Sequence, residues 1–92
     1  MEELEPKIQV AYALEKTLIT FKDESILEEH QIKKLESAIV LVINETGDRE
    51  LILDFCNVQF MSSSVLGLLV KIHKKVCELD GHLKLINVNQ NI

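Results

Sequence analysis

Three consecutive hydroxyl groups, on Ser62, Ser63 and Ser64, are the side chains of this sequence best placed to react. They lie between an apolar run, Leu51 to Phe55, and a segment with helical periodicity. The start of a helix has backbone N–H groups without intrahelical partners, and its dipole favours negative charge, so a phosphate could be added there. Serine is also a preferred N-cap residue. A regulatory role and a capping role are therefore both open for this turn.

Other chemistry lacks the residues that it needs. The three histidines, His30, His73 and His82, stand far apart with no nucleophile–base motif around them. His73 lies among apolar positions of a helix and is interpreted as a boundary residue. The chain has three glycines and no phosphate-binding glycine motif, so its sequence gives no sign of a nucleotide-dependent enzyme. We expect no catalytic residues, no cofactor and no enzymatic activity.

Acidic residues near the first predicted helix are the remaining candidates for metal ligation. Asp23, Glu24, Glu28 and Glu29 are close in sequence, but carboxylates at a helix start are ordinarily solvated and interact with the dipole. We therefore expect no metal site. Asp54, the carboxylate nearest the serines in sequence, is either a structural acceptor at a strand end or a recognition residue, and the former is preferred.

Composition narrows the class of protein. Ninety-two residues, 47% hydrophobic and 27% charged, predict one globular domain over residues 1–92. A net charge of −5 opposes non-specific binding to nucleic acid or to an anionic membrane, and favours a protein or a small molecule as partner. The basic cluster of Lys71, Lys74 and Lys75 is interpreted as the solvated face of a helix.

Cysteines and hydropathy bear on the compartment. Cys56 and Cys77 form no C-x-x-C motif, so we expect two buried free thiols and no disulfide or zinc site. The acidic start of the chain is unlike a signal peptide, and the longest aliphatic run, Ala38 to Ile43, is too short to span a bilayer. A cytoplasmic protein is expected.

The elements around the serines can be predicted from hydrophobic periodicity. Apolar residues alternate over residues 8–14, which predicts a strand, and Leu18 to Phe21 is a second β-rich run. The short Glu15-Lys16 connection between them predicts an antiparallel hairpin.

A first helix follows. Ser25 and Glu28 fit the S-x-x-E capping box at its start, and Gly47 is a suitable stop. Its predicted buried stripe is Ile32, Leu35, Ile39 and Val42.

The serines connect a third strand to a second helix. Glu50 to Phe55 is apolar almost throughout, which predicts a central strand covered on both faces. The helix after the serines has two adjoining apolar stripes, and both are expected to be buried: Val65, Leu69, Ile72, Val76 and Leu79 on one, and Leu66, Val70, His73 and Cys77 on the other. Asp80-Gly81 ends this helix, and a fourth strand occupies residues 83–88.

The opposite face of the second helix is a candidate binding surface. It consists of Ser64, Gly67, Lys71, Lys74 and Glu78. A glycine there either lets a partner approach closely or permits tight packing inside the domain, and both interpretations stay open.

The order β-β-α-β-α-β predicts an α/β fold. We expect a mixed four-stranded sheet with both helices packed on it and with the third and fourth strands parallel, joined by a right-handed crossover.

The segment LILDFCNVQFMSSSVLGLLVKIHKKVCELDGHLKLINV, residues 51–88, resembles the core of a STAS domain. This family includes anti-sigma factor antagonists and the cytoplasmic tails of sulfate transporters. The matching features are an aliphatic strand ending in Asp-aromatic, a serine-rich turn, Leu-Gly and a long amphipathic helix. The resemblance implies a single STAS-like domain in which the family's C-terminal helical part is short or absent, and the apolar patch so exposed could promote a homodimer.

In anti-sigma factor antagonists the turn usually reads Asp-Ser-Ser/Thr/Ala-Gly-Leu-Gly, and its first serine is phosphorylated by an ATPase-type kinase that is also the anti-sigma factor. Ser63 occupies that position, with Ser62 and Ser64 as alternatives. The resemblance implies a partner-binding surface formed by Ser62, Ser63, Ser64, Gly67, Lys71 and Lys74. Here Ser62 replaces the usual Asp and Val65 the first Gly. The alternative is a non-phosphorylated STAS scaffold or a module that binds a small ligand or lipid.

Overall fold

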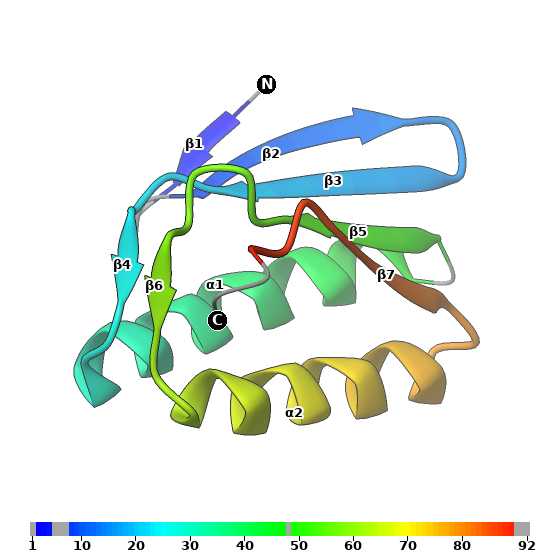
Figure 1. Cartoon of the computed structure of the whole chain (residues 1–92). Coiled ribbons are helices and arrows are strands. Elements are labelled where there is room, and N and C mark those ends of the chain that lie inside the picture. The colour runs from blue at the N-terminus through cyan, green and yellow to red at the C-terminus, as the bar shows by residue number, and fades with distance from the viewer. Residues whose placement is uncertain (1, 5–7, 48, 90–92) are drawn as a thin grey trace.

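A mixed β-sheet is the framework of the protein (Figure 1). The structure is a computed structural model and describes residues 2–4, 8–47 and 49–89. The elements are β1 (Glu2–Leu4), β2 (Ile8–Ala13), β3 (Lys16–Phe21), β4 (Ser25–Ile26), α1 (Glu29–Thr46), β5 (Glu50–Asp54), β6 (Phe60–Met61), α2 (Ser64–Glu78) and β7 (His82–Ile86).

The sheet has the strand order β1-β2-β3-β5-β7. β1, β2 and β3 are antiparallel neighbours, whereas β3, β5 and β7 are parallel. Parallel neighbours need a crossover, and α1 and α2 supply the two that are required here. The predicted α/β fold is confirmed: its four strands are β2, β3, β5 and β7, and β1 adds an edge strand. β4 and β6 form a separate parallel pair.

The hairpin turns one residue earlier than predicted. Ala13 pairs with Lys16, so the connection is Leu14-Glu15. Glu15 adopts a φ of 66°, in the left-handed region that few residues other than glycine visit. Tertiary pairing of both strands therefore imposes a turn that lacks the usual Gly or Asn signal.

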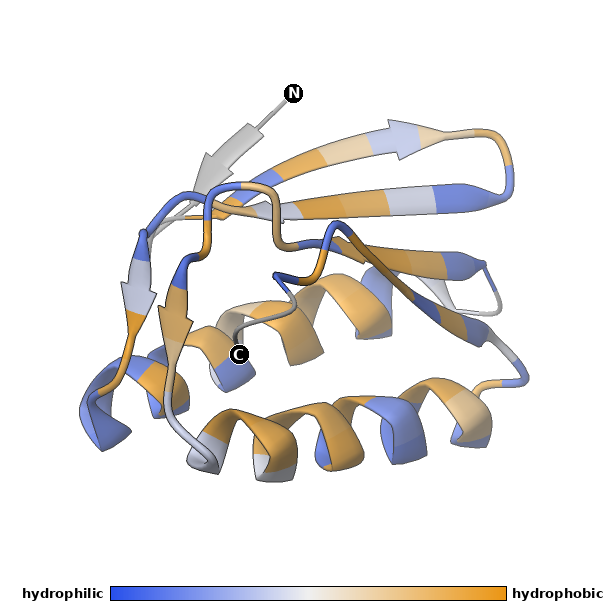
Figure 2. Cartoon of the chain, in the orientation of Figure 1, coloured by the Kyte–Doolittle hydropathy of each residue, from blue (hydrophilic) through white to orange (hydrophobic). Residues whose placement is uncertain are grey.

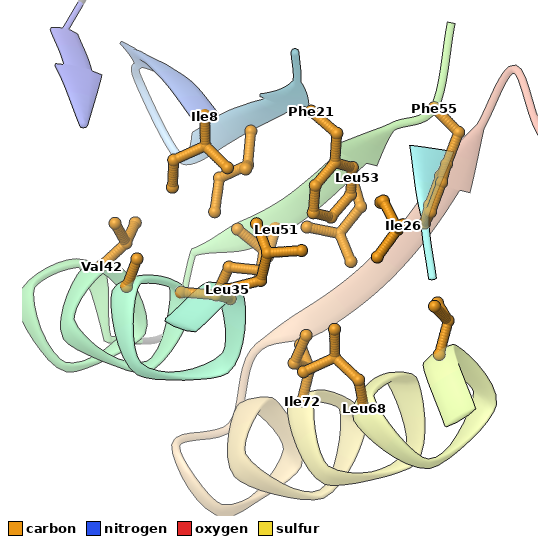
Figure 3. Packing of buried hydrophobic residues seen from close by; sticks show 14 of the residues in the cluster. Ile8, Phe21, Ile26, Leu35, Val42, Leu51, Leu53, Phe55, Leu68 and Ile72 are labelled. Carbon is orange, nitrogen blue, oxygen red and sulfur yellow. The ribbon is translucent and has the colours of Figure 1, made fainter. Parts of the chain in front are cut away.

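Both helices cover the same face of the sheet (Figure 1). The core is formed by strand residues that alternate toward the helices, by Phe55 just after β5, and by one stripe of each helix (Figure 3). Apart from Phe55, its main members are Ile8, Val10, Ile19, Phe21, Leu51, Leu53, Leu35, Ile39, Val42, Leu68 and Ile72. The rings of Phe21 and Phe55 lie 4.8 Å apart between centroids. The prediction that the third strand is covered on both faces is wrong, because in β5 only Leu51 and Leu53 are buried and Ile52 is half-buried on the other face.

Helix α1 begins at Glu29, with Glu28 as its N-cap. The predicted Ser25–Glu28 capping box is wrong because Ser25 belongs to β4, where it pairs with Phe60. The side chain of Gln31 serves the helix start instead: its Oε1 accepts hydrogen bonds from the backbone N–H groups of Leu27 (3.1 Å) and Glu28 (3.5 Å). The predicted buried stripe is confirmed, and so is the helix end at Gly47, whose φ is 64°.

Helix α2 buries a narrower face than predicted. Val65, Leu68, Ile72 and Val76 are buried, and Leu69 and Leu79 are partly buried. The second predicted stripe is wrong, because all four of its members are exposed: Leu66, Val70, His73 and Cys77. The coloured ribbon shows hydrophobic segments along α2 where it faces away from the sheet (Figure 2). No helix within the described residues has the length and apolarity to cross a bilayer.

Candidate functional site

The serine turn is held in place by the β4–β6 pair. After β5 the chain leaves the five-stranded sheet and passes into β6 of the separate β4–β6 pair, where Met61 pairs with Ile26. One residue further on, the backbone N–H of Ser62 donates to the carbonyl oxygen of Ile26 at 3.0 Å. The hydroxyl oxygen of Ser62 is buried and has no hydrogen-bond partner. Ser62 is therefore the inner member of the turn.

Ser63 is the N-cap of α2 and is exposed. Its backbone is already helical, with φ −61° and ψ −22°, and its side chain makes no capping hydrogen bond. A usual N-cap has extended backbone and accepts a bond from the first turn with its side chain. Ser63 thus presents its hydroxyl at the positive end of α2 without using it as a cap.

Ser64 is the first residue of α2 and is also exposed. The carbonyl oxygens of Ser62 and Ser63 accept the N–H groups of Val65 (3.1 Å) and Leu66 (3.0 Å). Backbone bonds therefore start the helix, and no acidic residue lies in its first turn. The helix dipole at this end is therefore not offset by a carboxylate of the helix's own first turn.

Gly67 lies one turn below Ser63, on the exposed face. A Cβ atom built there would meet no atom within 4 Å, so the glycine is not required for packing inside the domain. Of the two interpretations of this glycine, tight internal packing is excluded by this geometry.

The two lysines of the predicted surface differ. Lys71 Nζ lies 3.4 Å from Glu36 Oε1 of α1, which ties it to the neighbouring helix. Lys74 is exposed one turn further along. Neither lies in the first turn of α2, so they form the far end of the surface.

Sequence reasoning missed two apolar residues of this surface, Leu66 and Val70. Their exposed fractions are 63% and 67%. They follow Ser63 by three and seven residues, so they share its side of the helix. That spacing is the signal that could have found them, but hydrophobicity alone assigned both to the core.

Asp54 acts as a structural acceptor. Its Oδ1 accepts the backbone N–H of Cys56 and the Nδ2–H of Asn87, each at 2.9 Å. These bonds join the end of β5 to the residue after β7. Desolvation, followed by the nearby Asp54 carboxylate, raises the pKa of the Cys56 thiol, which keeps it protonated at neutral pH and a weak nucleophile.

Both cysteines are exposed, so the prediction of buried thiols is wrong. Cys77 Sγ lies 3.5 Å from His73 Nε2 on the surface of α2. His73 is exposed rather than a boundary residue, because no described element covers that side of α2. Within the described residues no three His, Cys, Asp or Glu side chains come close enough to hold a metal ion.

The fold is similar to that of SpoIIAA, an anti-sigma factor antagonist and cell fate determinant of Bacillus. The phosphorylated form superimposes with a TM-score of 0.71 at 20% identity, covering 91% of this chain and 75% of that chain. The unphosphorylated form gives 0.71 at 21% identity, covering 91% and 76%. The murine anion transporter Slc26a9 gives 0.74 at 14% identity, covering 89% of this chain and 13% of the transporter.

At these identities the structural likeness shows the fold. The comparison with curated proteins gives no match. The family model of the STAS domain, however, matches residues 10–92, which is most of the sequence. The chain therefore belongs to the STAS domain family.

Proposed function

We propose that this protein is a phosphorylation-controlled antagonist of an anti-sigma factor. In its unmodified form it binds a kinase-type anti-sigma factor, in the cytoplasm, through the serine turn and the exposed face of α2. Phosphorylation of Ser63 by that partner ends the binding. The observation that carries the proposal is the Ser63 hydroxyl, which is exposed at the start of α2 and makes no capping bond.

The geometry favours Ser63 over its neighbours. The hydroxyl oxygen of Ser62 is buried, so a kinase would have to open the β4–β6 end of the turn to reach it. Ser64 is exposed and stays the alternative acceptor. SpoIIAA, which has the same fold, is known in a phosphorylated form.

A phosphate on Ser63 would leave the fold intact. It adds a charge of about −1.5 to −2 at a helix N-terminus, where the dipole is favourable to anions. The phosphate would not be neutralised from within the domain, because Lys71 lies two turns away and is paired with Glu36. Its charge would face the partner.

The surface beside Ser63 explains why that charge would block binding. Leu66 and Val70 present apolar side chains, and Gly67 between them allows a partner's backbone to come close. Burying a doubly charged group at an apolar interface carries a large desolvation cost. The unmodified hydroxyl carries a far smaller one.

The test begins with incubation of the protein with the ATPase-type anti-sigma factor from the same organism and ATP. Modification is mapped by mass spectrometry, with Ser63→Ala and Ser64→Ala as matched variants. We expect phosphate on Ser63 only, and loss of modification in Ser63→Ala alone. Calorimetry then compares anti-sigma factor binding by Ser63→Ala and Ser63→Asp. Equal affinity of these two variants would refute the switch.

A further inference from the structure

A second exposed surface borders the serine turn on the side away from α2. The β4–β6 pair places Ser25 beside Phe60, and Phe60 is 56% exposed. Leu27, just after β4, is 53% exposed. In Figure 1 the two short strands lie side by side above the starts of α1 and α2. Ile26 and Met61 pack against the core from these two strands. The apolar side chains of Phe60 and Leu27 are instead left at the surface.

Carboxylates surround Leu27. An open hollow of about 460 Å³ is lined by Leu27 together with Asp23, Glu24, Ser25, Glu28 and Gln31. Glu24 is also tied to the other strand, since its carbonyl oxygen accepts the N–H groups of Gln59 (2.8 Å) and Phe60 (3.1 Å). The hollow and Phe60 are thus parts of one surface, which we call the acidic ledge: Asp23, Glu24, Leu27, Glu28 and Phe60.

The acidic ledge is held in shape from within. Gln31 Nε2 donates to Asp23 Oδ2 at 3.0 Å and to the carbonyl oxygen of Ser25 at 2.8 Å. Its Oε1 accepts the N–H of Leu27. One amide therefore fixes the loop between β3 and α1, and a partner would meet a preorganised surface.

The two ion pairs described for this domain lie away from the ledge. They join Lys16 to Glu50 and Lys71 to Glu36, and neither includes the carboxylate of Asp23, Glu24 or Glu28. The three carboxylates are also too dispersed to bind one metal ion together. Separate cationic side chains on a partner would complement them better than a single ion.

We propose that the acidic ledge is a second docking surface for the partner, and that its occupant is a basic protein segment with an apolar anchor. The anchor packs between Leu27 and Phe60, and Lys or Arg side chains beside it reach Asp23, Glu24 and Glu28. The assignment of this surface rests on the proposed function, because the acidic ledge adjoins Ser62 and would be covered by the same anti-sigma factor. Unlike binding at the serine turn, binding at the ledge would not depend on the phosphate, because the ledge offers only carboxylates and apolar area.

The experiment uses a probe that does not require the partner. A short peptide of alternating Arg and Leu is titrated into the isotope-labelled full chain and followed by NMR. Peptides of alternating Glu and Leu and of alternating Arg and Ser are the controls for charge and for the apolar anchor. We expect saturable shifts confined to residues 23–31 and 59–62 with the Arg-Leu peptide, and none of comparable affinity with either control.

Variants then assign the site. Glu24→Gln with Glu28→Gln should weaken the peptide by about five-fold or more, as expected for two partly exposed ion pairs. Glu15→Gln with Glu45→Gln makes the same change in net charge on exposed residues far from the ledge and should leave the affinity of the peptide unchanged. Phe60→Ser should lower the affinity of the Arg-Leu peptide without changing how that affinity depends on charge. Equal weakening by both glutamine pairs, shifts spread over the whole surface, or the same local shifts with Ca²⁺ alone would overturn the proposal.

The two proposals fail separately. Ser63→Asp should abolish anti-sigma factor binding while the Arg-Leu peptide binds as before. If the chain is never phosphorylated but binds the peptide at the ledge, the switch is refuted and the docking surface stands. If the chain is phosphorylated on Ser63 but gives no localised peptide shifts, the docking surface is refuted and the switch stands.

Discussion

The two helices of this domain start in opposite ways. At the start of α1 the Gln31 amide accepts backbone N–H groups, and Glu29 adds an acidic side chain to the first turn. At the start of α2 the Ser63 side chain caps nothing and the first turn has no carboxylate. Side chains of the first turn therefore complement the dipole of α1, whereas none does so at α2. The first start is completed within the domain, and the second is the one at which we propose phosphorylation.

The largest loss of stability is expected at Ile26, because the starts of both helices depend on this residue. Ile26 is 1% exposed, precedes α1, and accepts the N–H of Ser62 with its carbonyl oxygen. Ile26→Ala should lower the free energy of unfolding by about 2–5 kcal/mol, because it leaves a cavity below both turns. Urea denaturation measures this. Leu27→Ala, at an exposed neighbour, is the control and should cost less than about 1 kcal/mol. Similar losses in the two variants would contradict the inward position of Ile26.

The start of α1 should be the more sensitive of the two to loss of its polar side chain. Gln31→Ala removes the acceptor for Leu27 and the donor to Ser25, and should lower the free energy of unfolding by about 1–2 kcal/mol. Ser63→Ala, which removes no capping bond, should change it by less than about 0.5 kcal/mol. The comparison fails if Ser63→Ala is the more destabilising in the same denaturation assay.

Local pattern was sufficient for the order of the six longer elements, but it did not predict the short strands β1, β4 and β6. The period-2 and helical spacings predicted β2, β3, β5, β7, α1 and α2, and the buried stripe of α1 follows directly from its sequence. The exposed start of α2 at the serines was also expected. These features depend on neighbours within a few residues, which periodicity can detect.

The errors in helix capping and in burial depend on contacts between distant segments. Ser25 fits a capping box, but its pairing with Phe60 in β6 decides its conformation. Leu66 and Val70 look like core residues, since hydrophobicity does not reveal on how many sides a helix has neighbours. For the same reason the second face of β5 was expected to be covered. Sequence reasoning thus found the serines and missed the apolar surface beside them.

Gly67 tests whether the exposed face of α2 is used for binding. No atom would meet a Cβ there, so Gly67→Ala should raise the free energy of unfolding by about 0.8–1.0 kcal/mol through helix propensity. If a partner's backbone approaches at this point, the same variant should bind the anti-sigma factor more weakly. Thermal denaturation and calorimetry on one preparation measure both. A variant that is stabilised and binds normally would remove Gly67 from the interface.

Ser63→Asp should have the smallest of these effects on stability, and it tests the difference between the two helix starts most directly. The new carboxylate meets a dipole that no acidic residue of the first turn compensates, which should raise the free energy of unfolding by about 0.3–1 kcal/mol at neutral pH. The dipole lowers the pKa of the new carboxyl in the folded state. The gain is therefore present above the unfolded-state pKa of about 4 and is lost as the pH falls through the folded-state value. Denaturation of Ser63→Asp and Ser63→Asn across the acidic range would separate charge from hydrogen bonding. A gain that persists unchanged in acid, or that Ser63→Asn matches, would mean that the start of α2 is not the electrostatic site that the comparison with α1 requires.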